Sequence, residues 1–106
     1  MTQKQRIGAS KGAGRICLWN RAMIGHGFPI GQRIAIKQTG ARFTITPDEK
    51  GARKVSGVMN HGNRLPVIDL KQTKSLDVGS LGEVGDVVTV KIARNKITIT
   101  KDKDKQ

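Results

Sequence analysis

Two stretches of the chain alternate between apolar and polar residues, and this period of two predicts β-strands. The first stretch covers residues 33–37 and 42–46, with a Gly-containing bend at residues 39–41 that is typical of a hairpin. The second begins at Gly85 and turns at residues 93–95. The positions predicted to face a core are Ile34, Ile36, Phe43, Ile45, Val88, Val90, Ile92, Ile97 and Ile99.

The two alternating stretches are copies of one pattern. Residues 31–48 align with residues 85–102 at an offset of 54 without a gap. The opening Gly, a Lys, a Thr-Ile-Thr triplet and the closing Asp are identical in both copies. Half-repeats of this size cannot close a core alone, so the sequence predicts one compact unit in which two similar halves pack together.

The rest of the chain supplies shorter elements. We expect strands at residues 15–19 and 65–70, a short helical turn at residues 21–26 capped by Asn20, and a loop with a weak helical turn at residues 71–83. The fold class that follows is mostly β: a small barrel made of two homologous halves, with one or two short helical turns.

These elements predict a single barrel domain over residues 14–102. A flexible basic arm precedes it and a frayed tail follows it. Residues 55–59 of the connector could form a short strand. The predicted segments are the arm at 1–13, repeat 1 at 14–48, the connector at 49–63, repeat 2 at 64–102 and the tail at 103–106.

The first half resembles a known family. Gly14-Arg15-Ile16-Cys17-Leu18, a short helix ending at Gly27-Phe28, and a Gly-turn hairpin from Gly31 are similar to the AbrB/SpoVT-like swapped-hairpin superfamily, which includes SymE-type toxins and MraZ. The Gly-Asp turn of that family stands at Gly85-Asp86. The resemblance implies a swapped-hairpin (cradle-loop) barrel in tandem form, a fused equivalent of the family's dimer. It also implies DNA binding through the strand-to-helix region.

Composition limits the alternatives. The chain has 106 residues, 36% of them hydrophobic, which suits one modest core of aliphatic side chains. The single cysteine, Cys17, excludes an internal disulfide and fits a reducing cytoplasm. No apolar run is long enough to span a bilayer, and no signal peptide is recognisable at residues 1–11.

Charge points to a polyanionic partner. The net charge is +12, and no Asp or Glu occurs before Asp48. Residues 1–47 contain eight basic side chains, whereas residues 48–106 contain twelve basic and eight acidic ones. A field of one sign attracts nucleic acid and speeds the encounter with it. An acidic protein partner is the alternative.

We therefore predict a duplex-DNA-binding protein, a transcriptional regulator or DNA-coating protein of AbrB type, associated with the nucleoid and open to homodimer formation. The family's DNA face maps onto Lys11, Arg15 and Arg21, and the two Arg side chains are the candidates for reading guanine. Equivalent positions in the second half and on the connector complete the predicted set. The predicted nucleic-acid-binding residues are Lys11, Arg15, Arg21, Lys50, Arg53, Lys54, Arg64, Lys71 and Lys74. We interpret Lys91, Arg94 and Lys96 as solvated surface charges.

Catalysis and cofactor binding find little support in the sequence. His26 and His61 with Cys17 leave a metal site one ligand short, and the carboxylates do not pair on one predicted face. The Gly-rich stretch at residues 8–14 has no preceding strand and lacks the Gly-Lys-Ser/Thr order of a phosphate loop. We expect no enzyme activity, no catalytic residue, no metal and no cofactor.

Two rival functions remain open at this point. One is an RNA-binding toxin of the SymE type, and the other is a basic interaction protein that docks on an acidic protein and inhibits it. Single-strand binders rely on aromatic platforms, and only Trp19, Phe28 and Phe43 are aromatic here. Trp19 could stack on a base or pack into the barrel.

Overall fold

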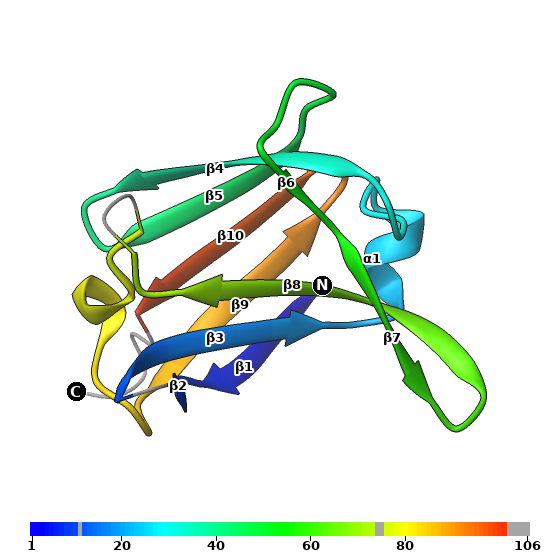
Figure 1. Ribbon diagram of the computed structural model, residues 1–106. Coiled ribbons are helices and arrows are strands. Elements are labelled where there is room, and N and C mark those ends of the chain that lie inside the picture. The colour runs from blue at the N-terminus through cyan, green and yellow to red at the C-terminus, as the bar shows by residue number, and fades with distance from the viewer. Residues whose placement is uncertain (11, 74–75, 102–106) are drawn as a thin grey trace.

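The computed structural model describes residues 1–10, 12–73 and 76–101. Ten strands, one short α-helix and one 3-10 turn make up these residues, and the strands form two antiparallel sheets (Figure 1). The elements are β1 (Thr2–Arg6), β2 (Gly8–Ser10), β3 (Ala13–Trp19), α1 (Ala22–Gly25), β4 (Arg33–Thr39), β5 (Arg42–Pro47), β6 (Arg53–Lys54), β7 (Ser56–Asn60), β8 (Asn63–Lys71), η1 (Val78–Leu81), β9 (Val87–Ala93) and β10 (Lys96–Lys101).

The larger sheet has the strand order β1-β9-β10-β5-β4-β6, and the smaller sheet has the order β2-β3-β8-β7. Figure 1 shows β3 and β8 lying across the strands of the larger sheet. The chain passes from one sheet to the other at Ile7, between β1 and β2, and at Val55, between β6 and β7. Both corner residues are buried, so the two sheets enclose one core in a barrel-like arrangement. The expected mostly-β fold is confirmed.

The core comes from the alternation that predicted the hairpins. The apolar side chains that the alternation predicted to face inward are fully buried, apart from Ile36, which is half-buried against them. Residues of β3 and β8 close the core from the other sheet. The largest fully buried side chains are Phe28, Phe43, Ile7, Ile16, Leu18, Met23, Ile34, Ile45, Leu70, Ile92, Ile97 and Ile99. Burial of this apolar surface is the main favourable term for folding.

The repeat appears in space as a local two-fold arrangement. In the pairing of β5 with β10, Thr44 lies opposite Thr98, its own counterpart at the offset of 54. In the pairing of β3 with β8, Ile16 lies opposite Leu70, which is again its counterpart. Because each residue pairs with its copy in an antiparallel register, a pseudo-two-fold axis relates the halves and passes near both pairs.

The two corners show that the structural repeat begins earlier than the sequence match. The Gly31 N–H donates to the Val55 carbonyl at 2.8 Å, and the Gly85 N–H donates to the Ile7 carbonyl at 2.8 Å. The reciprocal bonds, from Val55 to Gln32 and from Ile7 to Asp86, are both 2.9 Å long. Each half therefore consists of a corner, a hairpin of the smaller sheet and a hairpin of the larger one.

Residues 2–10, which the polar sequence predicted to belong to a flexible arm, contain two strands. Residues 2–6 form β1, which pairs with β9 at the edge of the larger sheet, and residues 8–10 form β2. The connector at 49–63 likewise contains β6 and β7, the counterparts of β1 and β2. Residues 1–10 and β6 contain too few apolar residues to show a strand period, whereas the possible strand at residues 55–59 corresponds to β7. The tail at 103–106 lies outside the described residues.

Short helical segments sit at the ends of the barrel. The Asn20 side-chain oxygen accepts a hydrogen bond at 2.8 Å from the N–H of Ala22, the first residue of α1, so Asn20 supports the start of the helix as its position predicted. The 3-10 turn η1 buries Val78 and Leu81. No helix in the described part of the chain is long and apolar enough to cross a membrane.

Candidate nucleic-acid interface

The outer face of the larger sheet is polar and cationic. Its strands alternate, so every second residue points away from the core, and directly paired residues share a face. These outward residues are mostly threonine, lysine and arginine. The basic ones are all exposed, and together they are called here the basic face: Lys4, Arg6, Arg33, Lys37, Arg42, Lys54, Lys91 and Lys96.

Within the described residues, no strand of the larger sheet contains an Asp or a Glu, on either face. Among the described residues, the acidic side chains belong to loops or, in the case of Asp69, to the smaller sheet. The cations of the basic face therefore have no acidic neighbours within their own sheet. Glu49, in the turn after β5, lines a depression together with Arg33 and Lys54 at the β6 edge of the sheet. The charges of the other cations of the basic face add into a field of one sign.

Three members of the basic face are held by local hydrogen bonds. The Lys4 Nζ donates to the Thr89 hydroxyl at 3.0 Å, Arg6 donates to the Gly85 carbonyl at 3.0 Å, and Arg33 donates to the Gly51 carbonyl at 2.9 Å. The remaining five, Lys37, Arg42, Lys54, Lys91 and Lys96, have no hydrogen bond or ion pair within the described residues. A ligand would therefore not have to displace an internal partner from them.

Four of these five cations form two pairs that are related by the pseudo-two-fold axis. Lys37 corresponds to Lys91, and Arg42 corresponds to Lys96, with Thr44 and Thr98 between them at the axis. A groove of about 400 Å³ follows this part of the face and is lined by Arg42, Thr89, Lys91, Ala93, Lys96, Thr98 and Thr100. Cations, hydroxyl groups and a shallow depression are the features that hold phosphate oxygens.

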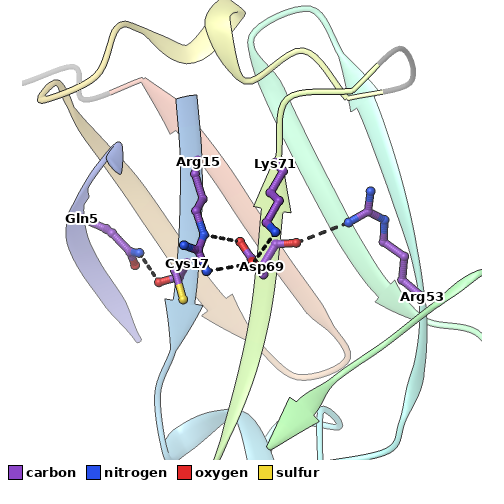
Figure 2. A network of polar contacts seen from close by, with 6 residues as sticks. All are labelled: Gln5, Arg15, Cys17, Arg53, Asp69 and Lys71. Atoms are coloured by element: carbon purple, nitrogen blue, oxygen red, sulfur yellow. Dashed lines mark hydrogen bonds and ion pairs between the residues drawn. The ribbon is translucent and has the colours of Figure 1, made fainter. Parts of the chain in front are cut away.

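Arg15 and Lys71, which the sequence placed in the interface, lie on the outer face of the smaller sheet, with Asp69 between them (Figure 2). Arg15 Nε and Nη2 donate to the two Asp69 carboxylate oxygens at 2.8 and 2.9 Å. Lys71 Nζ is 3.8 Å from the same carboxylate. The hydrogen bonds that Arg15 donates to Asp69, and the negative charge of Asp69, raise the pKa of Arg15. The Arg15 guanidinium nitrogens that would hydrogen-bond to guanine thus already donate to Asp69.

The other predicted residues are scattered. Arg53 points inward and donates to the Asp69 carbonyl at 3.3 Å (Figure 2), whereas Lys54 is on the basic face. Arg64 packs beside Gly57 on the β7–β8 hairpin, and Arg21 is exposed at the start of α1. Lys50 is exposed in the turn after β5. Lys11 and Lys74 lie outside the described residues. Of the predicted residues that the structure describes, only Lys54 therefore belongs to the basic face.

Lys91 and Lys96 were interpreted as solvated surface charges outside the interface, and the fold gathers them with Lys37 and Arg42 on one face. The signal that could have found them is the polar half of the alternation. In the two hairpins the outward positions carry only Lys, Arg, Thr, Val and Ala. These positions form one surface only because β5 pairs with β10, and the sequence alone does not specify that pairing.

The candidate catalytic and metal-binding groups do not assemble. His26 Nδ1 lies 2.6 Å from the Ala22 carbonyl within α1, and His61 occupies a tight turn with a positive φ of 51°. Within residues 1–10, 12–73 and 76–101, no three side chains of His, Cys, Asp or Glu come close enough to hold a metal ion.

In structural terms, the molecule belongs to the class of small, internally duplicated, barrel-like β-proteins with one acid-free cationic sheet face. A scan against protein-family models, a search of curated proteins and a search of solved structures each find no match to this chain.

Proposed function

We propose that this protein binds duplex DNA through the basic face. The observation that carries the proposal is the placement of eight cationic side chains on one face of six strands that contain no acidic residue. Contacts between such side chains and phosphates provide most of the affinity in sequence-tolerant binding, through the release of condensed counterions. Transcription regulation of the AbrB type stays a prediction from the family resemblance.

The symmetry of the face favours a duplex over a single strand. Lys37 and Lys91 are three strand spacings apart, which corresponds to about 14 Å. This is comparable to the major-groove width of about 12 Å in B-form DNA. The two antiparallel strands of a duplex are themselves related by local two-fold axes, so equivalent cations can meet equivalent phosphates. A single strand has no such symmetry.

A salt titration of DNA binding tests the proposal. The logarithm of the association constant should fall linearly with the logarithm of the salt concentration. The slope should be about −4.5 to −7, because between five and eight cations would each neutralise a phosphate. The measurement is fluorescence anisotropy of a labelled blunt duplex of about 20 base pairs, which at 3.4 Å per base pair exceeds the 35 Å length of the protein. Binding that does not change with salt would contradict the proposal.

Two matched double variants locate the interface. Lys37→Gln with Lys91→Gln removes two free cations of the basic face, and the slope should become shallower by about 2. Lys50→Gln with Lys71→Gln removes the same charge from exposed sites outside that face, and the slope should stay near the wild-type value. A shallower slope for the Lys50 and Lys71 double variant, with no change for the Lys37 and Lys91 double variant, would instead place the interface at residues predicted from the sequence. Tighter binding to single-stranded RNA than to duplex DNA would favour the RNA-binding alternative.

A further inference from the structure

Trp19 is an exposed tryptophan at the end of β3. Its exposed fraction is 53%, whereas the two other aromatic residues, Phe28 and Phe43, are fully buried in the core. The fold therefore decides between the two roles that the sequence left open, because Trp19 does not pack inside the barrel. Tryptophan is enriched at binding interfaces, so an exposed indole is a candidate contact for a ligand.

One side of Trp19 faces an open groove between β1 and the end of β3. The groove has a volume of about 590 Å³. It exists because β2 pairs with β3 only as far as Arg15, so the edge of β3 beyond this point faces β1 across a gap. The residues that line the groove are Gln3, Lys4, Gln5, Arg6, Trp19, Asn20 and Arg21.

Three side-chain amides are ordered across this gap. Asn20 Nδ2 donates to Gln3 Oε1 at 2.7 Å, Gln3 Nε2 lies 3.5 Å from Gln5 Oε1, and the Gln5 amide donates to the Cys17 carbonyl. Figure 2 shows Gln5 reaching from β1 toward Cys17 on β3. Amides beside an aromatic face are the groups that proteins use to hydrogen-bond the edges of unpaired bases.

The groove is also cationic and continuous with the basic face. Lys4 and Arg6 belong to both, because β1 is the edge strand of the larger sheet. Arg21 adds a third cation on the opposite rim and has no hydrogen bond or ion pair among the described residues. Among the residues that the structure describes, no acidic side chain lines the groove. A nucleic acid strand that leaves the basic face at β1 would therefore reach Trp19 along a path of positive charge.

We propose that this groove binds an unpaired nucleobase of DNA, which stacks on Trp19 while its flanking phosphates contact Lys4, Arg6 and Arg21. The inference rests on the proposed function of the basic face and narrows its substrate to duplex DNA with a single-stranded extension. Bases inside a duplex are stacked and paired, so they cannot offer a free face to the indole. An unpaired base can, and stacking of this kind tolerates any base.

A protein partner fits the groove less well than a base does. The other side of Trp19 borders a separate depression of about 330 Å³ that is lined by apolar residues, among them Val58, Met59 and Leu65. A protein that docked by hydrophobic contact would occupy this second depression. The side toward β1 instead offers amides and cations, which match a nucleotide in chemistry. Met59 is 65% exposed and therefore provides a matched apolar control on the other side of the indole.

Tryptophan fluorescence reports on the stacking directly, because Trp19 is the only tryptophan in the chain. The titrants are a blunt duplex, the same duplex with a short single-stranded extension, and that extension made of abasic nucleotides. The abasic form keeps the phosphates and removes the bases. We expect strong quenching with the base-containing extension only. Equal quenching by all three ligands, or none while the blunt duplex still binds, would overturn the base site and leave the proposed function standing.

Variants separate stacking from structure. Trp19→Ala should weaken binding of the extended duplex by roughly 5- to 150-fold, the range for loss of one stacked base, and leave blunt-duplex affinity unchanged. Trp19→Phe keeps an aromatic face and should retain most of the preference for the extended duplex over the blunt duplex. Met59→Ala should retain all of this preference. These affinities come from anisotropy of labelled DNA. Loss of the preference in Met59→Ala but not in Trp19→Ala would overturn the inference. If no duplex binds at any salt concentration, the proposed function itself fails.

Discussion

Gly51 shows how a single residue holds the turn that follows β5 against β4. Its N–H donates to the Asp48 carbonyl at 2.8 Å, and its own carbonyl accepts a bond from Arg33 of the basic face. A Cβ atom at this position would lie 2.1 Å from the Ile34 carbonyl oxygen and 2.5 Å from the carbonyl carbon. Both neighbours are backbone atoms of a central hairpin, so neither can move without disturbing the strand pairing.

We predict that Gly51→Ala lowers the free energy of unfolding by about 3 kcal/mol, toward the upper end of the cost of overpacking. Gly25→Ala is the control, because no atom lies within 4 Å of a Cβ placed there and the residue is helical. Its effect should stay within about 1 kcal/mol, since alanine favours the helix. Urea unfolding measures both variants. Equal midpoints for Gly51→Ala and the wild type would show that the turn does not pack closely on β4.

At the scale of elements, β1 is the clearest addition that the structure makes. The Ile7 N–H donates to the Asp86 carbonyl at 2.9 Å, and the register continues with Gln5 opposite Val88. Because antiparallel pairs alternate, the Gln5 N–H points toward β9, whereas the N–H of Thr2 points toward the open edge of the sheet. The strand therefore protects β9 and supplies two cations to the basic face.

Proline substitutions test whether β1 is a strand in solution. Gln5→Pro removes a hydrogen bond of the ladder and should destabilise the protein by about 1–3 kcal/mol, whereas Thr2→Pro should be tolerated. Gln5→Ala measures the separate loss of the side-chain bond to Cys17. Thermal or urea unfolding provides the comparison. Wild-type stability in all three variants is what a flexible arm would give, and it would refute the pairing of β1 with β9.

At the scale of the whole molecule, the pseudo-two-fold axis places residues of the two sequence repeats at equivalent positions on the surface. Lys37 and Lys91 occupy equivalent positions on either side of the Thr44–Thr98 pair, and Arg42 and Lys96 do so as well. If a duplex lies across this axis, equivalent cations contact equivalent phosphates. A monomer would then bind DNA in the manner of a symmetric dimer.

This symmetry predicts equal effects from equivalent single substitutions. Lys37→Gln and Lys91→Gln should each reduce the magnitude of the salt slope of duplex binding by about 0.9. The reduction in the double variant should equal the sum of the two single reductions. Arg42→Gln and Lys96→Gln form the second pair for comparison. Anisotropy titrations at several salt concentrations measure all of them. A large effect from one member of each pair and none from the other would mean that DNA contacts one half only.

Some of these features were predictable from the sequence alone. The alternation of Ile, Val and Phe with polar residues determined both hairpins and their buried positions, because side chains on a strand point to opposite faces in turn. The repeat at residues 31–48 and 85–102 determined that the halves are alike. The Asn20 cap before α1 was also predicted from local chemistry. All of these depend on residues that are close in the chain.

The binding surface was decided by the tertiary structure. The pairing of β5 with β10 joins two hairpins that are 54 residues apart and thereby assembles the basic face. On the opposite sheet, Arg15 is bound to Asp69. The gap between β1 and β3 leaves Trp19 exposed. These outcomes depend on contacts between distant segments, which hydrophobic periodicity does not encode. The sequence by itself determined which residues face the core, and the packing of the two sheets decided which charges face a ligand together.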